Sequence, residues 1–144
     1  MSIRFFTIIL TFGFCHIFSF TQNVDLTIKN INNDGGMICV AVFANQNEFQ
    51  NEKPFFDYKI QKSDSTGEIL NVQLSLRPGH YGISVLHDKN KNGKMDYNII
   101  GVPREGFGFS GYYLRGLKKP SFDDFAFWLE KNEKKKITVY MKYF

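Results

Sequence analysis

Oxygen-bearing side chains recur at alternate positions in one short segment of the chain. The segment reads HDKNKNGKMDYNIIGVPREGFGFS and runs from His87 to Ser110. Counted from an aspartate at position 1, Asp or Asn stands at positions 1, 3, 5 and 9 and glycine at position 6; these residues are Asp88, Asn90, Asn92, Asp96 and Gly93. The spacing is that of the first part of a calcium-binding loop, in which alternate side chains converge on one ion and the glycine permits the chain reversal. Oxygen ligands of this kind favour Ca²⁺ over transition metals.

The remainder of the loop pattern fails at its last position. The backbone carbonyl of Lys94 at position 7 is the expected main-chain ligand, and Met95 at position 8 is the expected apolar anchor to a core. Position 12, where a bidentate glutamate is required, is Ile99. Glu105, Asn98 or a backbone carbonyl would have to complete the shell, so we expect a weak site with a dissociation constant of about 10⁻⁴–10⁻³ M. The simpler interpretation is a polar Asn-Gly turn without metal.

Two further groups of residues flank the loop. His87 shares an expected strand face with Ile83 and Val85. It is therefore expected to be a core histidine or a support for the metal ligands, and it would serve less readily as an additional ligand itself. Aromatic rings stand among glycines after the loop, at Phe107, Phe109, Tyr112 and Tyr113. These rings would either stack on sugars, grip a protein partner, or fill the end of a small core.

The sequence shows no complete set of catalytic residues. No serine lies in a Gly-x-Ser-x-Gly turn, and no histidine pair has the spacing of a zinc-binding helix. His87, Asp88 and Glu105 would form an acid–base group only if the fold brings them together. We expect a non-catalytic module with a calcium-binding loop that serves a structural or interaction role. A glycan- or small-molecule-binding protein that uses the Phe107–Tyr113 rings is the alternative, and a hydrolase that uses His87 and Glu105 is less favoured.

The first 21 residues have the layout of a secretory signal peptide. Arg4 supplies the positive charge, and Phe5–Phe20 contains no charged residue and is mostly apolar. We expect cleavage after Thr21, and hence a periplasmic or extracellular protein with no transmembrane segment. Lipid attachment at Cys15 and an uncleaved N-terminal anchor are the alternatives.

Residues 22–144 are then expected to form a single domain. Removal of the leader takes away Arg4 and no acidic residue, so the formal charge falls from +4 to +3. Cys39 becomes the only cysteine, which excludes an internal disulfide, and it is expected to be a buried small hydrophobic residue. The modest charge predicts no nucleic-acid partner, and Lys134–Lys136 is expected to be a solvated strand edge.

Period-two alternation predicts mostly β-structure. Val24–Lys29 and Met37–Phe43 are expected to form a first hairpin, and a helical turn near Asn47–Gln50 is followed by an irregular crossover. Three further strands are expected at Ile69–Leu76, Tyr81–His87 and Ile137–Met141, a short strand at Phe109–Leu114, and one helical turn or an aromatic strand at Ser121–Trp128. About seven strands with regularly spaced turns predict an all-β fold, a Greek-key sandwich of the transthyretin-like or immunoglobulin-like kind.

The paired loop motif is similar to that of a known family. His87–Asp96 followed by Gly101-x-Pro103-x-Glu105-Gly106-x-Gly108-Phe109-Ser110 resembles the exported bacterial proteins grouped as domain of unknown function 2141. The Gly-Gly turn before Val40–Phe43 and the Pro78-Gly79-x-Tyr81 corner resemble that family too. The resemblance implies an exported β domain of the type common in Bacteroidetes. It implies no activity, cofactor or partner, so the partner stays an unknown protein or glycan.

Overall fold

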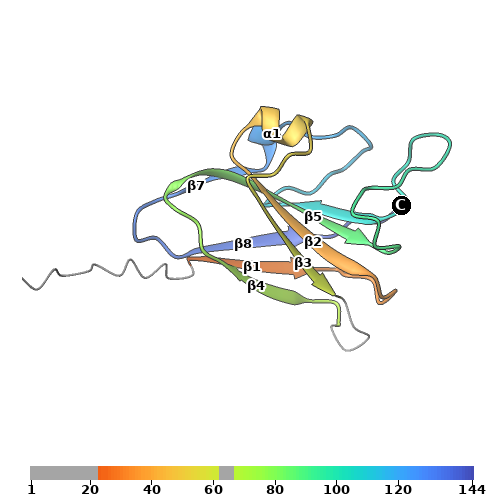
Figure 1. Cartoon of the computed structure of the whole chain (residues 1–144), viewed down its shortest axis with the longest axis horizontal. Coiled ribbons are helices and arrows are strands. Elements are labelled where there is room, and N and C mark those ends of the chain that lie inside the picture. Colours follow the sequence, from red (N-terminus) through yellow and green to blue (C-terminus); the bar gives the residue numbers. More distant parts are fainter. Residues whose placement is uncertain (1–22, 62–66) are drawn as a thin grey trace, which may run out of the picture.

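The polypeptide forms two β-sheets that pack face to face, and the computed structural model describes residues 23–61 and 67–144 (Figure 1). The smaller sheet has the order β4-β1-β8, and the larger has the order β3-β2-β5-β6, with β7 paired to the first half of β5. The elements are β1 (Val24–Lys29), β2 (Met37–Phe43), α1 (Gln46–Gln50), β3 (Phe56–Gln61), β4 (Leu70–Leu74), β5 (Gly79–Asp88), β6 (Gly106–Phe109), the 3₁₀ helix η1 (Phe122–Asp124), β7 (Ala126–Leu129) and β8 (Lys135–Tyr140). This arrangement confirms the predicted β-sandwich.

The predicted signal peptide lies outside the described residues. Among the residues that are described, no helix has the length and apolar character needed to cross a membrane.

The principal core lies between the two sheets. β1 buries Val24, Leu26 and Ile28, and β2 buries alternate residues from Ile38 to Val42, all at 0–1% exposure. This is the result expected from period-two alternation, because every second side chain of a strand points to the same face. Each fully buried aliphatic side chain of this size contributes about 1.5–3 kcal/mol to folding.

The predicted first hairpin is wrong, although both of its strands are correct. β1 pairs with β4 and β8, whereas β2 pairs with β3 and β5, so the two strands belong to different sheets. The connection contains three residues with positive φ, namely Asn30, Gly35 and Gly36, and it carries the chain from one sheet to the other. The apolar faces of β1 and β2 thus pack against each other across the core, and the two strands are not hydrogen-bonded neighbours in one sheet.

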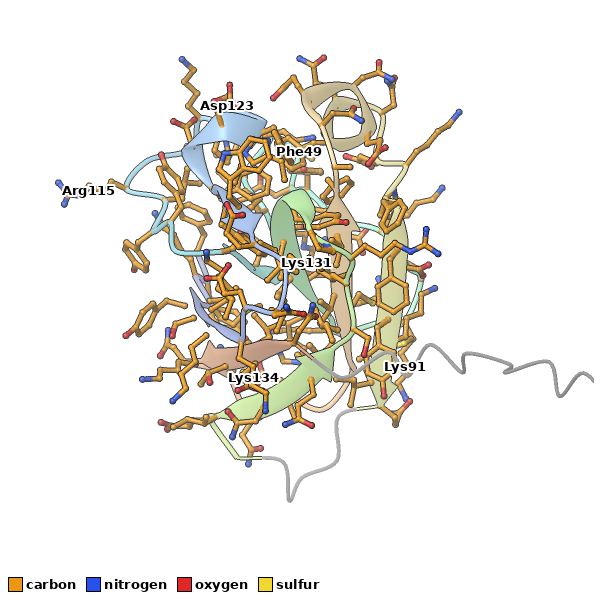
Figure 2. The ribbon with its side chains drawn as sticks, turned by 90° about the vertical axis from the view of Figure 1, so that its left-hand side faces the viewer. Phe49, Lys91, Arg115, Asp123, Lys131 and Lys134 are labelled. Atoms are coloured by element: carbon orange, nitrogen blue, oxygen red, sulfur yellow. The ribbon has the colours of Figure 1, made fainter. Side chains whose placement is uncertain are left out.

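A second cluster of apolar side chains covers the outer face of the larger sheet. Its buried members are Phe43, Phe49, Phe107, Phe109, Leu114, Phe122 and Phe125. Phe49 of α1 contacts Phe125 edge to face with ring centroids 4.8 Å apart, and Figure 2 shows its ring within this part of the molecule. The helical turns α1 and η1 therefore cover the outer face of the larger sheet.

Three segments differ in detail from the sequence-based expectation. Strand β3 lies in the segment expected to be an irregular crossover, and β6 ends at Phe109, where the expected strand Phe109–Leu114 begins. The Ser121–Trp128 segment contains both the helical turn and the strand that were predicted as alternatives. The helical turn is η1, which has a capping box between Ser121 and Asp124 at its N-terminus, and the strand is β7, which follows it. Cys39 is half-buried on the outer face of β2, whereas the sequence predicted a buried residue.

Candidate functional site

The predicted calcium loop connects β5 to β6 at one end of the sandwich. β5 ends at Asp88 and β6 begins at Gly106, and the connection projects beside the C-terminus (Figure 1). His87 and Asp88 are consecutive strand residues, so their side chains point to opposite faces of the sheet. His87 faces the principal core, whereas Asp88 faces the loop.

Asp88 organises the curled first half of the loop. Its side chain is fully buried, and its Oδ1 and Oδ2 accept hydrogen bonds from the backbone N–H of Asn92 (3.1 Å) and Gly93 (2.7 Å). The chain can fold back on this carboxylate because Lys91 and Gly93 adopt φ values of 63° and 78°. Left-handed backbone is inexpensive for glycine and uncommon for lysine.

The other predicted ligands converge on one another. Asp96 Oδ2 accepts hydrogen bonds from Asn90 Nδ2 (2.6 Å) and Asn92 Nδ2 (3.0 Å). The backbone N–H of Asn92 lies 3.0 Å from Asn90 Oδ1, so Asp88 and Asn90 share this donor. The structure therefore brings together the side chains that the sequence placed at positions 1, 3, 5 and 9.

The remaining loop residues anchor or frame this group. Lys94 is exposed, and its N–H donates to Asn92 Oδ1 over 2.8 Å. Met95 is half-buried and packs against the outer aromatic cluster, as its position in the pattern predicted.

Glu105 holds the two ends of the loop together. It is 4% exposed, and its Oε1 and Oε2 accept hydrogen bonds from the N–H of Lys89 (2.9 Å) and Asp96 (3.3 Å). A small hairpin makes this possible, because Tyr97 bridges to Pro103 and returns the chain to the side of Asp96. Glu105 thus supports the loop backbone.

The donor set suits a hard cation. Asp88, Asn90, Asn92 and Asp96 offer only oxygen ligands if the two amides turn by half a rotation, which exchanges nitrogen for oxygen at almost unchanged shape. The described part of the chain contains no group of three or more His, Cys, Asp or Glu side chains placed to hold a metal. Any ion in this loop would consequently depend on amide and backbone oxygens as well as on carboxylates.

His87 lies away from the loop carboxylates. It is fully buried, and its Nδ1 lies 2.9 Å from the Tyr143 hydroxyl while Nε2 contacts the carbonyl of Gly35. The Tyr143 hydroxyl also accepts a hydrogen bond from Asn32 N–H (3.0 Å). The network fits Nε2–H donating to Gly35 and the tyrosine O–H donating to Nδ1. His87 thus ties three segments together inside the fold, and its side chain is on the opposite face from Asp88 and Glu105.

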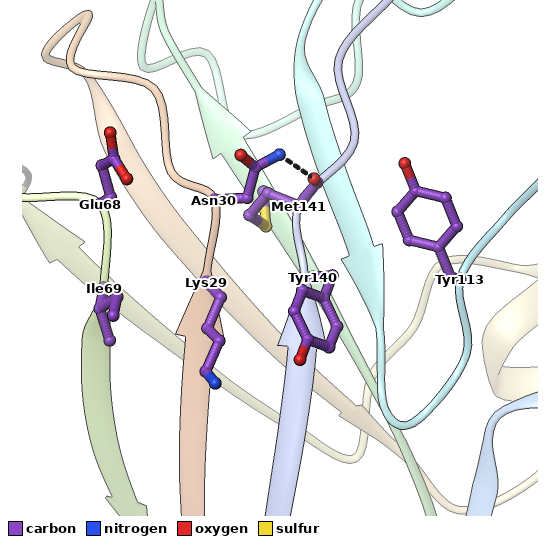
Figure 3. Close-up of a pocket in the computed structure, with 7 residues that line it drawn as sticks. All are labelled: Lys29, Asn30, Glu68, Ile69, Tyr113, Tyr140 and Met141. Carbon is purple, nitrogen blue, oxygen red and sulfur yellow. Dashed lines mark hydrogen bonds between the residues drawn. The ribbon is translucent and has the colours of Figure 1, made fainter.

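The four predicted aromatic binding residues are separated by the fold. Phe107 and Phe109 are each 8% exposed and belong to the outer aromatic cluster, and Tyr112 packs against it. Tyr113 is 55% exposed and, with Tyr140, lines a shallow pocket of about 450 Å³ (Figure 3). The four rings therefore do not form one continuous stacking surface.

The glycines of the Gly106–Ser110 motif allow close backbone contact. A Cβ on Gly106 would lie 2.1 Å from the Tyr143 ring, and one on Gly108 would lie 2.5 Å from Val139. Phe107 exchanges backbone hydrogen bonds with Lys142 at 3.0 and 2.7 Å, which ties β6 to the segment after β8. The motif therefore closes one side of the sandwich.

An exposed apolar tip was not singled out from the sequence. Ile99 and Ile100 are 104% and 78% exposed at the end of the small hairpin. The tip is held in shape by Asn98, whose Oδ1 accepts hydrogen bonds from the N–H of Ile100 (3.0 Å) and Val102 (2.9 Å). Two adjacent isoleucines in a polar loop were the available sequence signal.

The match to a family model covers most of the described fold. Residues 26–138 match the family described as "Uncharacterized protein conserved in bacteria (DUF2141)". Comparison with curated proteins and with solved structures gives no match. The matched span begins in β1 and ends in β8, so it includes both sheets and the whole loop from Asp88 to Glu105. The chain is therefore a member of the bacterial family DUF2141.

Proposed function

We propose that this chain is an exported, non-catalytic interaction domain whose β5–β6 loop binds Ca²⁺ weakly and is made rigid by it. The observation that carries the proposal is the convergence on Asp96, where the side-chain amides of Asn90 and Asn92 meet one carboxylate oxygen at 2.6 and 3.0 Å. A cation placed among these groups would bind their oxygens in place of the amide hydrogens.

The charge balance of the loop supports a bound cation. Asp88 and Glu105 are buried, and no salt bridge reaches either of them within the described residues. Their hydrogen-bond partners are backbone N–H groups, which stabilise a carboxylate without neutralising it. A divalent ion would supply the missing positive charge and draw the two halves of the loop together.

The interaction role rests on the tip next to the loop. Ile99 and Ile100 are held out in solvent by the Asn98 hydrogen bonds, and burying each against a partner would contribute about 1.5–3 kcal/mol. Beside the tip, Arg104 and Phe144 help line a shallow groove of about 560 Å³. A rigid loop presents such a tip at a lower cost in conformational entropy than a mobile one.

Thermal denaturation with and without calcium tests the proposal. Calcium at about 10 mM should stabilise the folded protein by about 1.4–2.7 kcal/mol for a dissociation constant of about 10⁻³–10⁻⁴ M, because the ion binds only the folded loop. The melting temperature should then be several degrees higher than in chelator. Mg²⁺ should give a smaller rise, since it is smaller and retains its waters.

Asp→Asn variants, which keep the side-chain shape and remove one negative charge, show which residues the calcium response depends on. Asp88→Asn and Asp96→Asn should each lose the calcium response, whereas Asp123→Asn, at an exposed aspartate of η1, should keep it. The comparison is between the calcium and chelator curves of each variant, so a lower starting stability of Asp88→Asn does not obscure it. Identical wild-type curves in calcium and chelator, or an unchanged response in both loop variants, would refute the proposal.

A further inference from the structure

Strand β3 is an exposed edge of the larger sheet. It pairs with β2 on one side, and among the described residues no strand pairs with its other side. Figure 2 shows β3 at the margin of the ribbon, next to β2. Phe56 and Tyr58 are 40% and 47% exposed, and Ile60 is only half-buried. An edge strand of this length offers unpaired backbone groups that can accept another strand.

The side chains of β3 are self-complementary when the strand is read in both directions. The segment from Phe56 to Ile60 reads apolar, acid, tyrosine, base, apolar. If two copies align antiparallel about Tyr58, Asp57 of each copy lies opposite Lys59 of the other, and Phe56 lies opposite Ile60. Tyr58 then lies opposite its own counterpart on the two-fold axis.

Other alignments of the two strands do not place opposite charges across from each other. Centring the pair on Asp57 or on Lys59 places like charges opposite each other, and a parallel in-register pair does so at both positions. Opposite charges and aromatic pairs directly across two strands are stabilising, and like charges are destabilising. Asp57 and Lys59 are both exposed, and neither forms a salt bridge within the described part of the chain.

We propose that a second copy of this chain pairs antiparallel with β3 through a two-fold axis at Tyr58. The two larger sheets then join into one continuous sheet, and the interface is the same patch on both copies. Phe56 and Tyr58 lie opposite Val42 and Val40 of β2, so they extend the inner face of the sheet toward this edge. Pairing would cover their exposed rings. A lysine on an edge strand ordinarily discourages pairing, and in this register the partner aspartate offsets it.

Sedimentation equilibrium of the purified protein in chelator tests the pairing independently of calcium. The wild type should show a monomer–dimer equilibrium. Asp57→Lys and Lys59→Asp should each weaken the dimer at least about tenfold, because every copy then meets two like-charged pairs. The double variant Asp57→Lys/Lys59→Asp restores opposite charges and should dimerise within about threefold of the wild type.

Mixing the two single variants provides the sharpest outcome. Asp57→Lys carries two lysines on β3 and Lys59→Asp carries two aspartates, so an equimolar mixture should form a heterodimer more tightly than either variant pairs with itself. Both positions are exposed, and unchanged melting temperatures would confirm that the variants fold. A wild type that stays monomeric up to about 200 μM, or a dimer unaffected by either single reversal, would overturn the proposal.

Discussion

Individual side chains at the end of β5 serve two different networks because strand residues alternate. Asp88 holds the loop through the N–H groups of Asn92 and Gly93, and His87 reaches Tyr143 and Gly35 on the other face. The Tyr143 hydroxyl connects the second network to the backbone N–H of Asn32. Burial raises the pKa of this hydroxyl above its ordinary value, and the N–H of Asn32 opposes the rise in part.

The raised pKa of Tyr143 predicts an alkaline loss of stability. A pKa that is higher in the folded chain than in the unfolded one gives a contribution that is complete below about pH 10 and is lost as the pH rises through the folded value. The wild-type melting temperature should fall more steeply above about pH 10 than that of Tyr143→Phe. At neutral pH the variant should be less stable by about 1–3 kcal/mol, because His87 and Asn32 lose their partner.

Melting curves between about pH 8 and 11.5 measure both effects. Tyr113→Phe, at an exposed tyrosine outside this network, is the control and should follow the wild type. Curves for Tyr143→Phe that run parallel to the wild type across the alkaline range would exclude the assigned role.

The sequence predicted the convergence of the loop side chains but not the means by which the loop is closed. The alternate oxygens from Asp88 to Asp96 follow from spacing alone, since a curled backbone with Gly93 at its reversal must bring them together. The carboxylate of Glu105 could not be placed in the same way. It reaches Asp96 only because the hairpin from Tyr97 to Pro103 takes up the intervening residues, and nothing in a one-dimensional pattern fixes that return.

At the scale of elements, strand existence was easier to predict than strand pairing. β1 and β8 show the alternation of a half-buried strand, and β2 is a continuous apolar run typical of a central strand, so their positions could be predicted from the sequence. β3 has five exposed residues out of six, so it gives no alternating apolar signal. The β1–β2 hairpin failed because alternation reports which face is buried but not which strand lies alongside.

Strand β6 provides the element-scale prediction. Gly106→Ala and Gly108→Ala should each destabilise the fold by about 1–3 kcal/mol or more, because the added methyl group collides with Tyr143 or with Val139 and the Tyr140 backbone. Chemical denaturation measures the loss. Gly116→Ala is the matched control, since a Cβ there meets no atom within 4 Å. Stability of either β6 variant equal to that of the control would show that β6 and the C-terminal segment are less tightly packed than described.

At the scale of the whole molecule, the smaller sheet depends on its central strand. β1 pairs antiparallel with β4 and parallel with β8. Removing residues 135–144 should therefore abolish cooperative folding, because β1 loses a neighbour and the core loses Ile137, Val139 and Met141. Circular dichroism and limited proteolysis would detect this. Removal of Phe144 alone, a 54% exposed residue, should leave the fold intact, and a cooperative transition in the shorter chain would contradict the prediction.

The parallel pair of β1 and β8 also sets the order in which the chain can fold. Val24 lies beside Lys135 in this pair, so the contact closes a very long loop and belongs to the kind of topology that folds slowly. A ribosome that has released β1 still holds β8, so the smaller sheet cannot form while the chain is being synthesised. The chain therefore stays open until β8 has been synthesised, and the sandwich closes only when this strand arrives.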